Sequence, residues 1–113
     1  MFSLSGVRQM KTNLKDINLE AFKPGISKKL LARDDSRNFQ IDFIRLEPNA
    51  RLSQHSHPDV EWVYVIEGSM CDERGEFSKG DFFINPINSQ HSVVSGADGC
   101  DILCCWCGEI KDC

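Results

Sequence analysis

The three histidines of the chain, His55, His57 and His91, lie at spacings that suit a metal site. His55 and His57 are one residue apart, and Glu61 lies four residues beyond His57. In a β-strand, residues i and i+2 project from the same face, so the first two imidazoles aim at one point. Glu61 opens a run in which it shares a face with apolar residues, and a buried carboxylate needs a cation as its partner. The pattern predicts one metal ion held by three imidazoles and one carboxylate.

This donor set suits one borderline divalent cation: zinc, iron(II), nickel, manganese or cobalt. An octahedral ion with four protein ligands keeps two adjacent positions for a bidentate substrate, which is the geometry that a dioxygenase requires. A tetrahedral zinc ion would have every position filled, as in structural zinc sites. The identity of the metal therefore decides between a catalyst and a structural or sensory module.

The elements that must position these residues read as short β segments between turns. The break Lys23-Pro24-Gly25 separates a weakly patterned N-terminal extension (1–23), where a short strand or a turn of helix are both open, from one domain (24–113). The expected strands are 26–31, 39–46, 52–57, 61–67, 69–72, 76–77, 82–84, 91–94 and 101–107. Short strands with a turn every few residues, and no helical pattern, predict an all-β sandwich or barrel.

The 113 residues suit a single domain. The net charge of −4, with acids and bases interleaved, argues against a nucleic-acid surface. No apolar run approaches the ~20 residues that a membrane span needs, and the N-terminal residues lack a signal-peptide pattern. We therefore expect a cytoplasmic protein in which the six cysteines are reduced.

The motif order resembles the two conserved motifs of the cupin superfamily: His55-x-His57-x3-Glu61-x6-Gly68, then Gly80-x5-Pro86-x-Asn88-x2-His91. A narrower likeness, to the ChrR-type cupin domain and to acetylacetone-cleaving dioxygenases, rests on residues 72–77, 80–81, 89–91 and 99–100. The resemblance implies an RmlC-like conical β-barrel (a double-stranded β-helix jelly roll) with the metal bound inside by the three histidines and the glutamate. Two departures are Asn49, where a glycine usually opens the first motif, and Ser95, where an asparagine often closes the second.

Two functions follow as hypotheses. The first is a small metal-dependent, dioxygenase-like enzyme acting on a diketone-like or phenolic compound. The second is a non-catalytic, zinc-bound module that binds a small ligand or senses oxidants, with Cys71 or Cys100 as the residues to oxidise. ChrR carries a helical anti-sigma domain before its cupin, and only about 25 residues precede the first clear strand here, so we expect no sigma-factor binding. Polar residues that could support the metal ligands are Gln40, Arg45, Gln54 and Asn85.

Other residues with chemical potential have simpler interpretations. Trp62 and Tyr64 lie on the strand face opposite Glu61, so we expect them on the outer wall of the barrel, where they favour a homodimer. The run 104–107 could form a second metal site through Cys105 and Cys107, but packing as small apolar residues is the favoured interpretation for these cysteines.

The same packing interpretation applies to Cys71 and Cys100. The acidic residues Asp72, Glu73 and Glu76 are expected to form a solvated hairpin rather than a calcium loop.

Overall fold

The computed structural model describes residues 2–3, 11–57, 59–107 and 111–112, which form strands and turns but no helix. Within these residues there is accordingly no helix of the length and apolarity that a bilayer span demands. The strands are β1 (Phe2–Ser3), β2 (Glu20–Lys23), β3 (Ile26–Asp34), β4 (Phe39–Leu46), β5 (Arg51–Ser56), β6 (Glu61–Asp72), β7 (Gly75–Ser78), β8 (Phe82–Asn85), β9 (Gln90–Cys107) and β10 (Lys111–Asp112). The predicted all-β class is confirmed.

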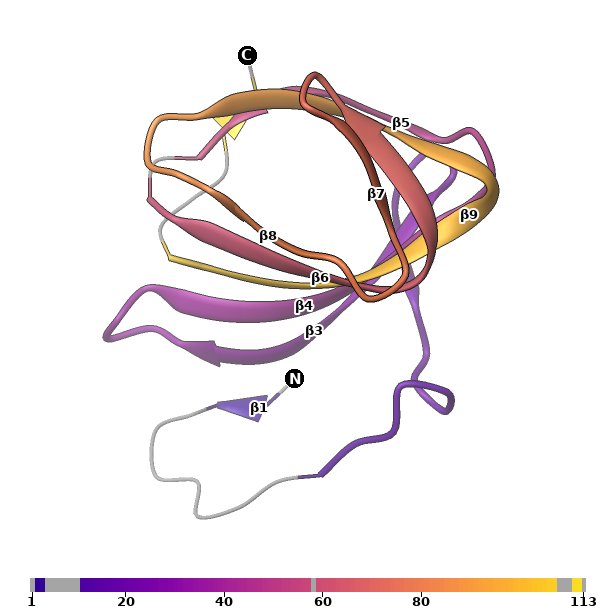
Figure 1. Ribbon diagram of the computed structural model, residues 1–113. Coiled ribbons are helices and arrows are strands. Elements are labelled where there is room, and N and C mark those ends of the chain that lie inside the picture. Colours follow the sequence, from indigo (N-terminus) through magenta and orange to yellow (C-terminus); the bar gives the residue numbers. More distant parts are fainter. Residues whose placement is uncertain (1, 4–10, 58, 108–110, 113) are drawn as a thin grey trace.

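The long strand β9 holds the two walls of the barrel together (Figure 1). Its first half pairs with β5, its second half pairs with β4, and most of its length pairs with β6. β6 in turn pairs with β7 and β8, while β3 extends the sheet beyond β4. All of these pairings are antiparallel, and the ribbon curves round a closed interior. The arrangement agrees with the predicted jelly-roll barrel.

Alternation along β6 decides which side chains face the interior. Val63 and Val65 are buried, whereas Trp62 and Tyr64 are exposed, as predicted. Alternation from Glu61 would also place Glu67 on the inward face, but its side chain is 63% exposed, so that extension of the pattern is wrong. The register between β6 and β9 shifts between Val65 and Glu67, and this irregularity ends the simple alternation.

Two glycines that the sequence marks as strand ends are bends inside continuous strands. β6 runs through Gly68, and β9 runs through the expected loop 95–99. Gly68 and Gly99 have φ angles of 77° and 76°, which residues with a Cβ rarely adopt. A Cβ at Gly68 would also overlap the carbonyl oxygen of Gly99. The two strands therefore bend together round the barrel at this point, instead of stopping.

The interior is mainly apolar. Its core is a cluster of Ile26, Leu46, Ala50, Val63, Val65, Met70, Phe83, Val93, Cys100, Ile102, Cys104 and Trp106. Cys105 is also buried, so packing is confirmed for three cysteines. Cys71 is exposed, and the prediction that it packs inside is wrong. Cys71 is next to the corner at Met70, where the register of β6 shifts again.

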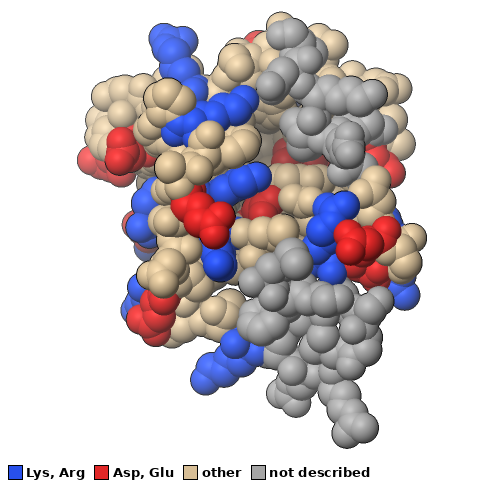
Figure 2. All heavy atoms as spheres, turned by 180° about the vertical axis from the view of Figure 1, so that it is seen from behind, with Lys and Arg blue, Asp and Glu red and all other residues tan. Residues whose placement is uncertain are grey.

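The N-terminal part of the described chain lies against β3. β2 pairs antiparallel with β3, and β1 pairs parallel with it. The segment around Leu14 forms a turn, closed by the bond from the Asp16 amide to the Asn13 carbonyl, rather than a strand or a helix. On the face drawn in Figure 2, basic and acidic side chains are interspersed.

Candidate metal centre

Pairing between β5 and β9 brings His55 and His91 together. His55 and His91 are directly opposed partners in the antiparallel register. His57 follows β5, where its backbone amide donates to the Ser89 carbonyl (3.1 Å) and its carbonyl accepts from the Asn88 amide (2.7 Å). Asn88 has a φ of 65°, a conformation that asparagine tolerates well. The turn before β9 therefore holds the backbone of His57 in place, whereas the ring Nδ1 has no hydrogen-bond partner among the described residues.

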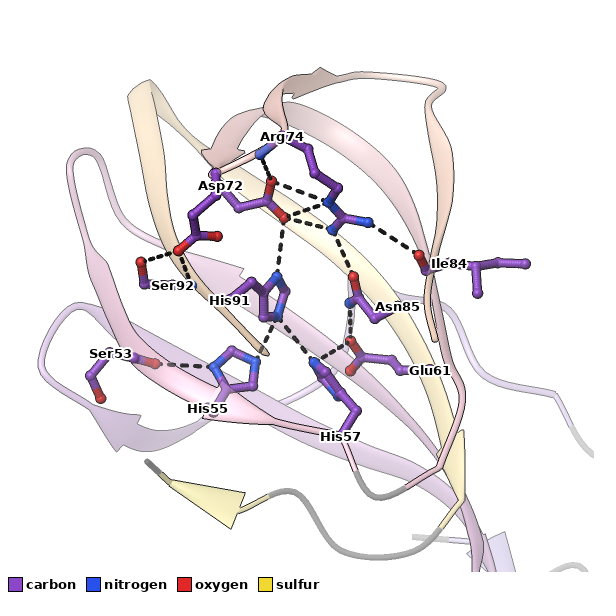
Figure 3. Close-up of polar contacts among 11 residues, drawn as sticks. Ser53, His55, His57, Glu61, Asp72, Arg74, Ile84, Asn85, His91 and Ser92 are labelled. Atoms are coloured by element: carbon purple, nitrogen blue, oxygen red, sulfur yellow. Dashed lines mark hydrogen bonds and ion pairs between the residues drawn. The ribbon is translucent and has the colours of Figure 1, made fainter. Parts of the chain in front are cut away.

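The three ring nitrogens converge (Figure 3). His91 Nε2 lies 2.8 Å from His55 Nε2 and 3.1 Å from His57 Nε2. Glu61 Oε1, at the start of β6, lies 3.6 Å from His57 Nε2. All four residues are buried. The structure therefore brings the three histidines together, with Glu61 beside His57.

The hydrogen bonds of the outer ring nitrogens fix which nitrogen carries the proton. His55 Nδ1 lies 3.0 Å from the Ser53 carbonyl, and His91 Nδ1 lies 3.1 Å from Asp72 Oδ2. Both oxygens accept, so each Nδ1 must donate, and each Nε2 of a neutral ring then presents a lone pair. Two such lone pairs at 2.8 Å repel one another unless a cation lies between them. Ligands about 2.1 Å from one ion are about 3 Å apart, so the donor set fits a metal.

The charge states of His57 and Glu61 also favour a bound cation. Burial lowers the pKa of His57 to about 4, helped by the neighbouring histidines, so this ring is neutral at pH 7. Burial raises the pKa of Glu61 to about 7, although the hydrogen bond from Asn85 opposes the rise. Their contact is therefore not a charged pair. A divalent ion would supply the positive charge that the buried Glu61 carboxylate lacks beside it, and such an ion binds neutral imidazoles.

Asp72 is a site residue that the sequence reasoning misses. Its side chain is fully buried, and Oδ2 accepts from His91 Nδ1 and from Arg74 Nη2 at 2.6 Å. Burial opposes its charge, but the hydrogen bonds from Arg74 and His91 prevail, and the pKa lies below its usual value. The prediction of a solvated hairpin is therefore wrong for Asp72. Glu73 and Glu76 are exposed as expected.

Of the four polar residues proposed to support the ligands, Asn85 contacts one. Its Nδ2 donates to Glu61 Oε1 at 2.7 Å. Gln54 is exposed, and Gln40 donates to Asp42.

Arg45 pairs with Asp101 through two hydrogen bonds at the surface. The cationic residue near the site is instead Arg74, which lies in the turn between β6 and β7. An arginine two residues after an aspartate in a hairpin is the one local signal that could have found this pair.

A cavity of about 50 Å³ lies beside the histidine cluster. His55, Glu61 and His91 form its polar side, and the rest of its wall is apolar. Phe22 of β2 borders the cavity and is 44% exposed, so β2 forms its edge toward solvent. The cavity has room for a few waters or a small group that reaches the ligand atoms.

Among the described residues, His55, His57 and His91 form the one group of metal-ligating side chains close enough to share an ion. Cys104 and Cys105 instead have thiol pKa values raised by burial, to about 11 for Cys105. The favoured packing interpretation of these cysteines agrees with both observations.

Known proteins are similar to this chain in sequence or in fold. Oxalate decarboxylase OxdC of Bacillus subtilis (strain 168) is 29% identical over 108 residues, which cover 86% of this chain and 28% of that protein. This chain thus spans less than a third of that relative's length. The anti-sigma factor ChrR of Rhodobacter sphaeroides, solved in complex with SigE, superposes with a TM-score of 0.75 at 20% identity, over 83% of this chain and 51% of that one.

An acetylacetone dioxygenase from Acinetobacter johnsonii superposes with a TM-score of 0.82 at 12% identity, over 92% of this chain and 77% of that one. At these identities the two structures establish the fold alone, which is the cupin barrel expected from the sequence. The family described as the ChrR Cupin-like domain matches residues 7–106, which is most of the chain. The protein therefore belongs to the ChrR cupin-like domain family.

Proposed function

We propose that this protein is a small metal-binding cupin in which His55, His57, Glu61 and His91 hold one divalent ion. The observation that carries the proposal is the convergence of three imidazole Nε2 atoms whose opposite nitrogens, in His55 and His91, already donate to oxygen. Neutral, buried imidazoles with an oxygen partner on the outer nitrogen are the usual arrangement of histidine ligands. The adjacent carboxylate completes the donor set.

For its activity, we propose a dioxygenase-like enzyme that acts on a small diketone-like or phenolic compound. A bound divalent ion would supply Lewis-acid chemistry, stabilising an anionic oxygen of the substrate. The protein itself would orient the substrate and exclude water. The apolar wall of the cavity would enclose the hydrocarbon part of the compound, and its polar side would direct the oxygens toward His55, Glu61 and His91.

The alternative is a non-catalytic, zinc-bound module that binds a small ligand or senses oxidants. Membership of the ChrR cupin-like domain family favours this reading. Of the two cysteines considered as sensors, Cys71 is exposed, whereas burial raises the pKa of Cys100 to about 12. A protonated, buried thiol reacts slowly, so Cys71 is the better candidate.

Elemental analysis of protein purified without added metal separates the two functions. It is followed by oxygen-uptake assays of the iron(II) form with 1,3-dicarbonyl compounds. Bound iron, or uptake by the iron(II) form that a His57→Ala variant lacks, would support the enzyme. Zinc at one ion per chain with no uptake by the iron(II) form would support the module.

The expected homodimer, the cytoplasmic location and the boundary between an N-terminal extension (1–23) and the cupin domain (24–113) stay predictions. The dimer would use the outer face of β6 and β8, where Trp62 pairs with Ile84 and Tyr64 pairs with Phe82, all four exposed. Sedimentation of the purified protein tests it, because Phe82→Ser should convert a dimer into a monomer. The described cysteines are free thiols, as a reducing compartment would keep them.

A further inference from the structure

A chain of hydrogen bonds joins His91 to Glu61 behind their inward-facing atoms (Figure 3). On one arm, His91 Nδ1 lies 3.1 Å from Asp72 Oδ2, which lies 2.6 Å from Arg74 Nη2. On the other arm, the same Nη2 lies 2.6 Å from Asn85 Oδ1, and Asn85 Nδ2 lies 2.7 Å from Glu61 Oε1. His91, through Asp72, and Glu61, through Asn85, are thus both linked to one guanidinium nitrogen.

The chemistry of Arg74 sets the direction of every bond in this chain. A guanidinium stays charged in proteins and can only donate. Asp72 must therefore accept, and the Asn85 amide must turn its oxygen toward Arg74. Because the oxygen is used in this way, the Asn85 nitrogen is directed at Glu61.

Each arm ends by orienting a proposed ligand. His91 faces a carboxylate, so its Nδ1 carries the proton and its Nε2 lone pair points at the other histidines. Glu61 Oε1 accepts from the Asn85 amide, which holds the carboxylate in one orientation. Asp72 and Asn85 are both buried, so neither arm exchanges its bonds for water.

The position of Arg74 is fixed independently of the ligands. Its Nη1 donates to the Ile84 carbonyl at 3.1 Å. Its guanidinium lies 5.2 Å from the ring centroids of both Phe77 and Phe83, within cation–π range. The hairpin of β6 and β7 together with β8 therefore holds the guanidinium in place.

We propose that Arg74 is a positioning residue that, through Asp72 and Asn85, holds His91 and Glu61 as electron-pair donors to a divalent cation. The inference rests on the proposed metal site and deepens it. It assigns to the hairpin the task of preorganising two ligands that come from different strands.

Cobalt(II) is a suitable probe, because its visible absorption spectrum reports the geometry of its ligands. Metal-free protein is titrated with cobalt(II), and the affinity is measured in competition with a chelator. Asp72→Asn and Arg74→Lys should each weaken cobalt(II) binding about 10–100-fold and change the spectrum of the bound ion. Arg74→Lys keeps the charge but removes the planar fork, in which Nε also donates to Asp72 and Nη1 donates to the Ile84 carbonyl while Nη2 serves both arms.

Two matched controls remove the same chemical groups outside this chain of bonds. Glu73→Gln alters the neighbouring carboxylate, which accepts from Ser92 instead. Arg45→Lys alters an arginine that pairs with Asp101 at the surface. Both controls should bind cobalt(II) with the affinity and the spectrum of the wild type.

The outcomes separate this inference from the proposed function. A wild-type protein that binds no cobalt(II) would refute the metal site itself. A wild type that binds, with Arg74→Lys equal to it in affinity and spectrum, would refute the role of Arg74 alone. Circular dichroism verifies the fold of each variant. If Asp72→Asn does not fold, Arg74→Lys decides, because the Arg74 side chain is 43% exposed and tolerates the change more readily.

Discussion

The chain carries two dense sets of potential metal ligands, and the structure treats them in opposite ways. The histidines come from the end of β5 and the start of β9, and their ring nitrogens converge within hydrogen-bonding distance. The cysteines of residues 104–107 come from one strand, so alternation sends Cys104 and Cys105 to opposite faces. Among the described residues, convergence from different strands, not local density, brings candidate ligands close enough to share an ion.

The histidine and cysteine sets also differ in whether their donor atoms are protonated. The outer nitrogens of His55 and His91 donate to oxygens, which leaves the inner nitrogens as electron-pair donors. Burial raises the thiol pKa values of Cys104 and Cys105, which keeps these sulfurs protonated. A thiol must lose its proton to bind a metal. The environment of β9 therefore suits packing at one end and coordination at the other.

The largest expected effect is on metal content. His57→Ala removes one of the three converging imidazoles, so stoichiometric metal binding should be lost. Elemental analysis of the purified variant measures this loss. An unchanged ratio of metal to protein in His57→Ala would refute the site as drawn.

The next effect is on thiol reactivity. Cys71 is exposed, whereas Cys104 and Cys105 are buried with raised thiol pKa values, so an alkylating reagent should modify Cys71 at least about tenfold faster. Mass spectrometry of peptides from the native protein measures the rates. Equal rates at Cys71 and Cys104 would contradict the assignment of the cysteines in β9 to the interior.

A smaller effect is expected on stability. Replacing Cys105 and Cys107 together by alanine should cost about 1–2 kcal/mol of unfolding free energy, mainly because Cys105 is buried. The metal content should stay at the wild-type value. Urea unfolding and elemental analysis of the same sample test both statements. A loss of metal in this variant would indicate that Cys105 and Cys107 bind the ion.

The smallest effect concerns Asp42, which is buried and has one oxygen without a hydrogen-bond partner among the described residues. Burial raises its pKa above the usual value of 3.8, while Gln40 and nearby Lys28 lower it less. The folded protein then holds this proton more tightly than the unfolded chain. The stability present below pH 3.8 is lost as the pH rises through the folded pKa.

Asp42→Asn should remove this part of the pH dependence, which urea unfolding at several pH values measures. Asp35→Asn, at an exposed position, is the matched control and should keep the wild-type slope. A slope in Asp42→Asn as steep as that of the wild type would show that Asp42 is not the buried acid responsible.

The all-β class and the burial of His55, His57 and Glu61 could be predicted because they depend on local pattern. The spacing of His55 and His57 fixes their common face, and alternation correctly separates Trp62 from Val63. Glu61 could be placed inside because it begins that alternation. Each of these conclusions needs only the period of a β-strand.

Asn85 is the one supporting residue that the sequence suggests, whereas the roles of Asp72 and Arg74 depend on pairing between distant segments and could not be predicted. Asp72 and Arg74 look like solvated hairpin residues until the β6–β7 hairpin folds over His91. Gly68 and Gly99 read as strand ends in the sequence, yet their close approach makes them bends. Local composition does not distinguish a turn from a bend shared by two strands.

X-ray absorption spectroscopy of the metal-loaded protein compares the histidine and cysteine sets in one experiment. Three converging imidazoles and one carboxylate predict nitrogen and oxygen neighbours at about 2.0–2.2 Å, with the outer scattering that imidazole rings produce. Sulfur at about 2.3 Å, or a protein that retains no ion, would contradict the assignment of the site to His55, His57, Glu61 and His91.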